Sequence, residues 1–250
     1  MTTLTPTDNA VSYLTSPANP GSGMFIWQLR MQCGIVIGGL DAVISAITGF
    51  SPLEEWVFKP LAGDWNALDR GAVAWSSAGR AVQAVSNNID SLPGQIGDAW
   101  EGEGFEAFAT TQATLAQTLG DLPAACDAMS EMTSTLADLA RTIAEFVAMI
   151  IKAVSDWAIK MLASAAVPVA GQVAMGGWIA ELGAKIATWV PKLSGMITRF
   201  VNFVAKISAV VIKIRDVIIK IDKILAILTK AIKAIDSAAQ KTTAAAAAIT

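Results

Sequence analysis

The sequence contains no histidine, which removes the side chain that most often serves as a general base or a metal ligand. It has two cysteines, Cys33 and Cys126, which stand 93 residues apart and form no metal-type pair. A Gly-x-Ser-x-Gly elbow, a phosphate-binding loop and a dinucleotide-binding glycine motif are also missing. We therefore expect no catalytic residue, no cofactor, no bound metal and no enzymatic activity.

Charged residues are scarce as well, at 16% of the chain, whereas hydrophobic residues make up 54%. Strand-forming aromatics are few, and alanine, isoleucine, leucine and methionine are abundant, a composition that favours helices. The 250 residues are enough for one large domain or two small ones. We predict an all-α protein, built as a long antiparallel helical hairpin extended by further packed helices into an elongated helical bundle.

The few charges are unevenly distributed. Residues 1–150 carry a net charge of −11 and residues 151–250 a net charge of +8, which indicates two functional regions. The basic residues alternate with isoleucine and valine instead of aromatic stacking platforms, so we expect no nucleic-acid partner. The N-terminus also lacks the basic start and apolar run of a secretory signal peptide, so an exported chain would use another route.

Both cysteines lie in apolar helical surroundings. Two small buried thiols fit this pattern, and a disulfide between Cys33 and Cys126 remains open because spacing alone cannot establish one. The carboxylate pairs Glu54/Glu55 and Glu101/Glu103 lie at predicted helix starts, where they favour the positive end of the helix dipole.

The first third of the chain predicts an arm followed by short helices. Residues 1–23, rich in Thr, Ser, Pro, Asn and Gly, should form a disordered arm. Residues 24–65 should hold N-terminal helices: one packed helix over 24–49, and a short helix that starts at Ser51 and ends near Phe58. Gly34 and Gly38 have the spacing that lets helices approach closely, with membrane dimerisation as an alternative.

Residues 66–160 carry the strongest helical pattern. A helix that begins at Asn66 should end or bend at Pro93-Gly94. Apolar residues then recur at three- and four-residue steps from 105 to 161, with Gln112 and Thr133 as polar exceptions, and Gly120 to Pro123 should interrupt the helix. Because the repeat keeps its phase across this interruption, we predict a coiled-coil-like seam that continues on the helical segments before and after it, so that both pack on one surface.

Between these helices lies Trp100-Glu101-Gly102, followed by Phe105 and Phe108. Gly102 allows a tight reversal, and the Trp100 ring can fold onto the outgoing helix. The arrangement resembles the WXG-motif family, the helical-hairpin substrates of type VII (ESX) secretion in actinobacteria and related Gram-positive bacteria. The likeness covers about residues 66–145, and the flanking segments resemble long actinobacterial members, including N-terminal regions of secreted toxins.

The resemblance implies export as a folded hairpin, often paired with another hairpin in a four-helix bundle. Trp100, Gly102, Phe105 and Phe108 would form the turn and export motif. A secreted or cell-surface location, reached without a signal peptide, is the corresponding expectation. Family members or their partners commonly carry a Tyr-x-x-x-Asp/Glu signal after the second helix, but the one tyrosine here, Tyr13, precedes Leu14-Thr15-Ser16-Pro17.

Residues 161–240 form an apolar region that becomes basic and amphipathic, before a frayed tail over 241–250. The uncharged stretch 161–180 predicts either a buried hairpin that turns near Pro168 to Gly171 or a membrane-inserting hairpin. Beyond it, we expect a surface for a partner helix, self-association or a membrane, carried by five regularly spaced lysines: Lys206, Lys213, Lys220, Lys223 and Lys230.

Three functions remain compatible with the sequence. The first is a non-enzymatic secreted protein of the type VII pathway, whose hairpin is an export and pairing module. The second is a membrane-active protein that uses residues 161–236 for pore formation or translocation. The third is the delivery region of a toxin whose catalytic domain lies elsewhere.

Overall fold

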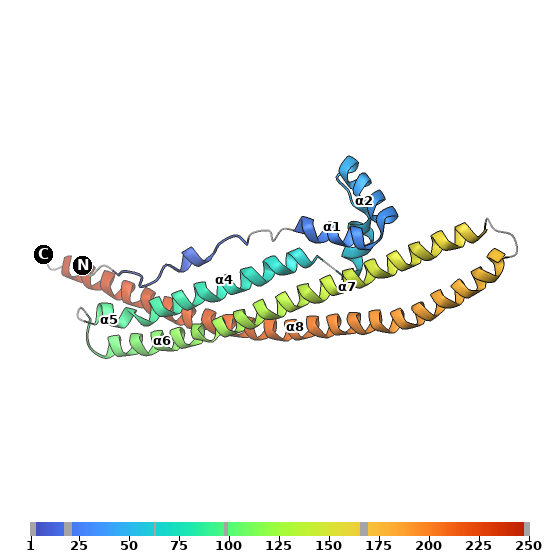
Figure 1. Cartoon of the computed structure of the whole chain (residues 1–250). Helices are drawn as coiled ribbons and strands as arrows, with labels where there is room; N and C mark the ends of the chain where they lie inside the picture. Colours follow the sequence, from blue (N-terminus) through green and yellow to red (C-terminus); the bar gives the residue numbers. More distant parts are fainter. Residues whose placement is uncertain (1–3, 18–21, 63, 98–99, 166–169, 248–250) are drawn as a thin grey trace. The chain divides into compact units, whose positions relative to one another are not determined.

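The computed structural model describes residues 4–17, 22–62, 64–97, 100–165 and 170–247 and confirms the all-α class, since the described residues form helices and no strand (Figure 1). The elements in chain order are η1 (Ala10–Tyr13), α1 (Ser22–Gln32), α2 (Ile35–Thr48), η2 (Leu53–Phe58), α3 (Lys59–Ala62), α4 (Trp65–Asp90), α5 (Leu92–Ile96), α6 (Glu103–Gly120), α7 (Leu122–Ala165) and α8 (Ala170–Ala247).

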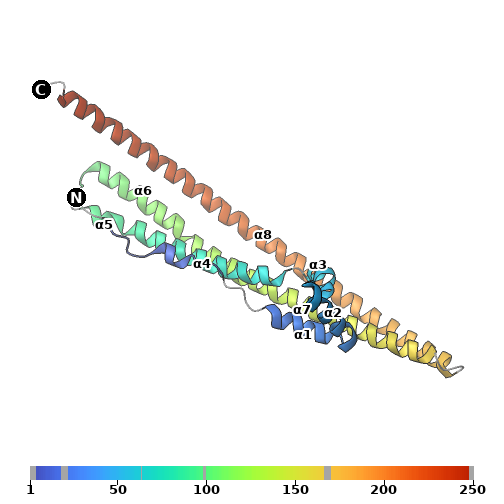
Figure 2. The same cartoon turned by 90° about the horizontal axis from the view of Figure 1, so that it is seen from above.

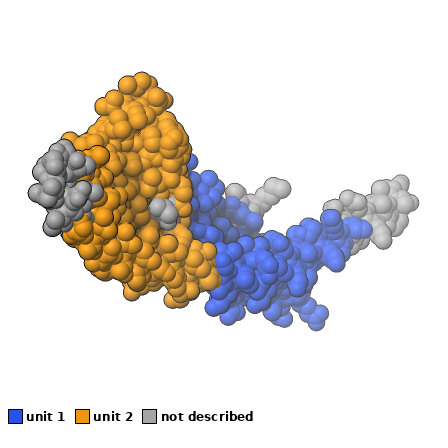
Figure 3. All heavy atoms as spheres, turned by 90° about the vertical axis from the view of Figure 1, so that its right-hand side faces the viewer, with its two compact units in different colours: residues 1–16, 74–130, 208–250 blue, residues 17–73, 131–207 orange. Residues whose placement is uncertain are grey.

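The chain divides into two compact units, coloured separately in Figure 3. The first unit comprises Met1–Ser16, Ala74–Ser130 and Ser208–Thr250. The second comprises Pro17–Val73 and Glu131–Ile207. Each unit therefore combines segments that are distant in the sequence.

The second unit contains a hydrophobic core where the N-terminal helices meet α7. Leu29, Cys33, Phe58 and Trp65 are buried there, and the edge of the Phe25 ring meets Trp65 at 5.3 Å between centroids. The facing side of α7 is a row of small residues at three- and four-residue steps: Ala137, Ala140, Ala144 and Ala148. These small side chains leave room along α7, and the large side chains of the facing helices fill that room.

The single helix expected over residues 24–49 is wrong: α1 and α2 are separate helices, visible in Figures 1 and 2. Gly34 sits between them with φ 95°, a conformation that favours glycine. A Cβ at Gly38 would lie 1.8 Å from the carbonyl oxygen of Arg30, so this glycine permits α2 to fold back against α1. The two glycines thus serve contact within the chain.

The predicted helix start at Ser51 is confirmed, because the Glu54 amide donates a hydrogen bond to Ser51 Oγ at 3.1 Å. The predicted end near Phe58 is wrong. The chain continues from η2, a π-helix, into α3, and the Lys59 amide still donates to the Glu54 carbonyl. The wider π turn brings Lys59-Pro60 into the helix and not into a terminating bend.

In the first unit, the N-terminal stretch expected to be a mobile arm is held by hydrogen bonds. The Asp8 amide donates to Asn88 Oδ1 at 2.8 Å, and Asn88 Nδ2 returns a bond to the Asp8 carbonyl at 2.7 Å. Thr5 and Gln95 exchange a similar pair, each at 3.1 Å. The segment has no regular secondary structure at these positions, so side-chain amides of α4 and α5 pair with its backbone N–H and C=O groups.

The interruption predicted between Gly120 and Pro123 is confirmed, since α6 ends at Gly120 and α7 begins at Leu122. Pro123 lies in the first turn of α7, where its missing amide hydrogen costs nothing. The end of the preceding helix is also confirmed, because α4 ends at Asp90 and the short α5 contains Pro93 and Gly94.

In the second unit, α7 and α8 run antiparallel. Trp157 Nε1 of α7 donates to the Trp178 carbonyl of α8 at 3.0 Å, whereas an earlier part of α7, at Thr142, lines a groove together with a later part of α8, at Phe203. The predicted turn at Pro168 to Gly171 falls partly on 166–169, outside the described residues. Of the two alternatives for 161–180, the buried hairpin does not fit the described side chains: Leu162 is 75% and Ile179 is 55% exposed, and Met161 and Trp178 are half-buried. The frayed tail predicted from 241 is helical as far as Ala247.

Candidate functional site

The candidate site is the turn between α5 and α6, in the first unit. Gly102 caps the start of α6 with φ 96° and ψ −175°, a region of backbone space that is almost restricted to glycine. Its carbonyl accepts hydrogen bonds from the amides of Phe105 (2.9 Å) and Glu106 (3.2 Å). Gly102 therefore fixes the direction in which α6 leaves the turn.

Three aromatic rings meet at this turn. The Trp100 ring lies 5.9 Å from Phe105 and 5.4 Å from Phe108, measured between ring centroids. These distances fall within the range of favourable aromatic pairs, each of which contributes about 0.5–1.5 kcal/mol beyond burial. The structure thus brings together the four residues predicted for the turn motif: Trp100, Gly102, Phe105 and Phe108.

Trp100 also packs on its own turn. A Cβ at Gly104 would lie 3.6 Å from Trp100 Cζ2, an ordinary van der Waals distance, so the ring rests over the first residues of α6. Trp100 nevertheless keeps 37% of its surface exposed, and Glu101, Gly102, Glu103 and Gly104 are exposed around it. The turn is therefore both fixed in conformation and accessible.

Contacts on either side of Gly102 show an antiparallel hairpin. Ser86 Oγ donates to the Ala116 carbonyl at 2.9 Å, and these residues stand 16 before and 14 after Gly102. Gly79 faces Cys126, and they stand 23 before and 24 after. The near-symmetric spacing means that Gly102 is the midpoint of the hairpin, with α4 on one side and α6 and α7 on the other.

Close approach of the two arms depends on a glycine. A Cβ at Gly79 would lie 3.0 Å from Cys126 Cβ and 3.4 Å from the Pro123 carbonyl oxygen. In the second unit, the continuation of α4 contacts α7 through Gly71 and Thr133, and through an ion pair between Asp69 and Arg141. The roles of Gly79, Gly71, Asp69 and Arg141 were not predicted from the sequence. For the two glycines, the available signal was their position in the interior of a helical pattern.

The predicted seam is buried over most of its length. Its two polar members are buried too, and the first of them, Gln112, donates from Nε2 to the Ile89 carbonyl. That carbonyl lies in the last turn of α4, where a helix leaves carbonyl groups unpaired. Val154, predicted as part of the seam, is instead 39% exposed. The buried members are Gln112, Leu115, Leu119, Leu122, Cys126, Met129, Thr133, Leu136, Ala140, Ile143 and Val147.

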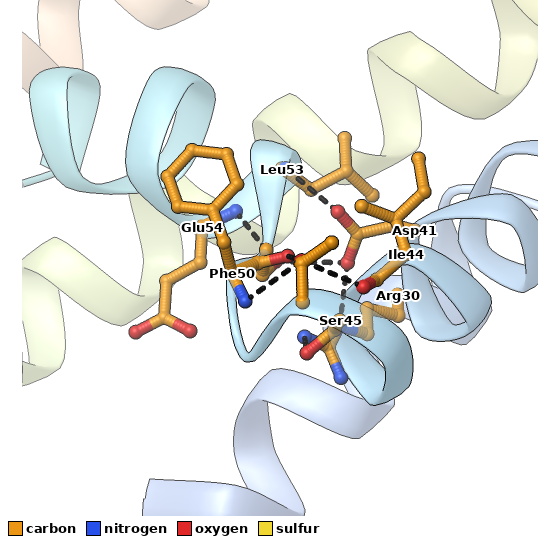
Figure 4. A network of polar contacts seen from close by, with 9 residues as sticks. Arg30, Asp41, Ile44, Ser45, Phe50, Leu53 and Glu54 are labelled. Carbon is orange, nitrogen blue, oxygen red and sulfur yellow. Dashed lines mark hydrogen bonds and ion pairs between the residues drawn. The ribbon is translucent and has the colours of Figure 1, made fainter.

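The second unit contains a buried polar network that was not predicted from the sequence (Figure 4). Asp41 is 4% exposed, and its carboxylate accepts hydrogen bonds from Ser51 Oγ (2.8 Å) and the Leu53 amide (2.9 Å). Arg30 Nε lies 2.6 Å from the same carboxylate, and Arg30 also donates to Ser45 Oγ at 2.9 Å. Asp41 thus ties α1, α2 and the start of η2 together. The signal in the sequence was that Arg30 and Asp41 are the only charged residues of the apolar segment 24–49 and have opposite signs.

The lysines predicted for a partner or membrane surface are all exposed, but they form no single site. Lys206 Nζ lies 5.5 Å from the centroid of the Phe203 ring, in a groove that α7 and α8 line within the second unit. The others belong to the first unit and follow two separate rows along α8: Lys213 and Lys220 in one, Lys223 and Lys230 in the other.

The cysteines are both free and buried, so the disulfide alternative is not realised. Burial, reinforced by nearby Asp41, raises the pKa of the Cys33 thiol to about 11. Burial also raises the pKa of Cys126. Because the thiolate is the reactive form, both are poor nucleophiles near neutral pH. Within the part of the chain that the structure describes, no three metal-ligating side chains cluster.

Among the described residues, one helix is long and apolar enough by composition to span a membrane: Gly176–Ala234 contains an 18-residue window with mean hydropathy 1.5. None of its best window is buried within the chain. This exposed apolar helix is the second candidate functional feature.

No family model, curated protein or solved structure matches the chain.

Proposed function

We propose that this chain is a non-enzymatic, secreted helical protein of the type VII (ESX) secretion pathway, in which the hairpin around Gly102 is the export and pairing module. The observation that carries the proposal is the turn itself. Gly102 adopts a conformation reserved for glycine, and the Trp100 ring closes on Phe105 and Phe108. These are the residues on which the resemblance to the WXG-motif family rests.

The geometry of the turn supports a role in recognition. The exposed crest combines an aromatic ring with two carboxylates, Glu101 and Glu103, on a backbone whose direction is fixed. A preformed epitope loses little conformational entropy on binding, which suits it to an export receptor that accepts folded hairpins.

Pairing with another hairpin protein accounts for the missing tyrosine signal. Tyr13 belongs to the N-terminal stretch, where its hydroxyl donates to the Asp8 carboxylate at 3.4 Å. It precedes the hairpin and lacks an acidic residue four positions later. In this proposal, the partner hairpin supplies the Tyr-x-x-x-Asp/Glu signal and the two proteins leave the cell together.

The pathway is tested by expressing the chain in an actinobacterial host with an active type VII system and in the same host lacking the secretion ATPase. The proposal expects the chain in the culture filtrate or on the surface of the first host, and retention inside the second. A cytosolic marker controls for lysis. Equal release from both hosts would refute the proposed route.

A second candidate function is membrane activity, and the observation that favours it is the helix over Gly176–Ala234, whose most apolar 18-residue window is not buried within the chain. The basic residues of the region would attract anionic lipid. Flotation and dye release with phosphatidylglycerol vesicles test this function on the whole chain. Binding with leakage would support it, and the absence of both would exclude it.

A further inference from the structure

One face of α8 in the first unit is apolar and uncovered. Its residues follow three- and four-residue steps, which place them on one side of a helix. Every member is exposed, and the isoleucines retain 43–50% of their surface. We call this surface the α8 outer face; its members are Val211, Ile212, Arg215, Ile218, Ile219, Asp222, Leu225, Ala226 and Thr229.

The chain covers a different side of the same helix. Ile214 is 8% exposed, and Val210, Val217, Ile221 and Ile224 are half-buried. Their steps also follow a three-four pattern, offset by one residue from Val211, Ile218 and Leu225. The apolar part of α8 is therefore wider than the strip that the chain itself covers, as in a helix that packs on two neighbours.

The charges of the segment are sorted between faces. Lys213 and Lys220 lie on the side of the helix away from the outer face. Lys223 and Lys230 follow Ile219 and Ala226 by four residues, so they border the outer face without lying at its centre. Within the outer face stand one cation, Arg215, and one anion, Asp222, which are seven residues apart and therefore two helical turns apart. In the single chain, an Arg215 nitrogen lies 3.3 Å from a carboxylate oxygen of Asp216, its neighbour in sequence, and both side chains of this contact remain exposed. The face is thus electrically neutral in a strongly basic region.

This arrangement is self-complementary under a two-fold axis. An axis that passes between Ile218 and Ile219 brings Arg215 of one helix opposite Asp222 of an antiparallel second helix, and does so twice. The same axis sets Ile218 against Ile219 and Ile212 against Leu225. Each exposed branched residue near the centre of the face thereby meets another apolar side chain.

We propose that the α8 outer face is an interface for a second copy of this chain, which binds antiparallel about that axis. Two reciprocal Arg215–Asp222 ion pairs set the register, and the isoleucines supply the apolar contact. A parallel arrangement in the same register would oppose Arg215 to Arg215 and Asp222 to Asp222, so the charges select the antiparallel one.

The same charges argue against lipid as the occupant of this face. Asp222 lies in its centre, and insertion into a bilayer would strip water from a carboxylate without giving it a partner, which is costly. A second copy offers that partner in Arg215. This inference concerns α8 alone and does not depend on export by the hairpin.

The test is a charge exchange in the full-length chain, followed by sedimentation equilibrium. We expect a wild-type dimer. Arg215→Asp opposes two pairs of carboxylates and Asp222→Arg opposes two pairs of guanidinium groups, so each should weaken dimerisation by about tenfold or more. The double variant R215D/D222R should restore it. An equimolar mixture of the two single variants should form a heterodimer, because each then supplies the charge that the other lacks.

Lys220→Glu, also a charge reversal on exposed α8 but on the side away from the outer face, is the matched control and should dimerise like the wild type. Circular dichroism of each variant should show the same helical content as the wild type. A chain that stays monomeric at about 100 µM, or a dimer insensitive to both single reversals, would overturn the proposal. So would phosphatidylglycerol-vesicle binding that Ile218→Glu abolishes in a chain that is monomeric without vesicles, since the face would then belong to lipid.

Discussion

The indole ring of Trp100 lies 5.4 Å from the ring of Phe108, with 42° between their planes. Trp100 precedes Gly102 and Phe108 lies in the second turn of α6, so this contact closes the chain reversal across the turn. A fixed turn sets the register of the arms, and the spacing of Ser86 and Ala116 on either side of Gly102 reflects it.

Replacing Gly102 should strain the turn. We expect Gly102→Ala to destabilise the protein by about 1–3 kcal/mol, because the backbone conformation of Gly102 is strained for a residue with a Cβ atom. Chemical denaturation of the two proteins measures the difference. Gly94→Ala is the control: Gly94 lies within α5 with open space where the alanine methyl group would lie, so this change should be neutral or slightly stabilising. Equal effects at both positions would contradict the strain argument.

Two interior glycines of α4 should respond differently to alanine. Gly71→Ala should stabilise by about 0.5–1 kcal/mol, since alanine favours helix. Its Cβ would meet Thr133 Cγ2 at an ordinary 3.5 Å. At Gly79 the new Cβ would meet Cys126 Cβ at 3.0 Å, so the close contact should offset that gain or reverse it. Thermal unfolding of both variants decides this, and a larger gain at Gly79 would mean that the arms are not tightly apposed there.

Asp41 should be the most sensitive polar position. Asp41→Asn keeps the shape but leaves the Arg30 guanidinium without its anion, and removing one partner of a buried ion pair costs about 3–5 kcal/mol. Asp138→Asn, which breaks an exposed pair with Arg141, should cost under about 1 kcal/mol. Urea midpoints compare the two variants with the wild type. A mild effect at Asp41 would mean that the network adds little to the second unit.

The buried thiol of Cys33 predicts a pH dependence. Its folded pKa is about 11, above the ordinary value of 9.0, so the unfolded state releases this proton first as the pH rises. The thiol's contribution is complete below pH 9 and is lost progressively between pH 9 and 11. Unfolding midpoints across that range should therefore fall more steeply for the wild type than for Cys33→Ala. Parallel curves would show that Cys33 ionises freely in the folded protein.

Much of the helical architecture was predictable because local signals determine it. The seam from Gln112 to Val147, the break before Pro123 and the cap at Ser51 follow from periodicity, proline and side-chain capping. These features depend on residues within a few turns of one another. The four turn residues were predictable for the same reason.

The errors arose where distant contacts decide the structure. The N-terminal stretch has the composition of a mobile arm, yet Asn88 and Gln95 hold it from 80 or more residues away. The break at Gly34 depends on the space that Gly38 leaves for the Arg30 carbonyl, and the Asp41 network joins three separate elements. No local pattern contains these contacts. The exposure of Leu162 and Ile179 likewise depends on which helices pack against them, and the hydropathy of the sequence contains no information about those neighbours.

If the aromatic turn directs export, then variants of the turn should change the secreted fraction of the chain. Trp100→Ala should remove the ring contacts with Phe105 and Phe108, yet leave the helices formed, because the seam residues are untouched. Trp27→Ala, at a tryptophan that is 57% exposed in the second unit, is the matched control.

In a host with an active type VII system, we expect Trp100→Ala to stay in the cell, and the wild type and Trp27→Ala to be secreted to the same extent. Helical content, measured on the retained protein by circular dichroism, should equal that of the wild type. Undiminished secretion of a folded Trp100→Ala variant would show that the aromatic turn does not direct export.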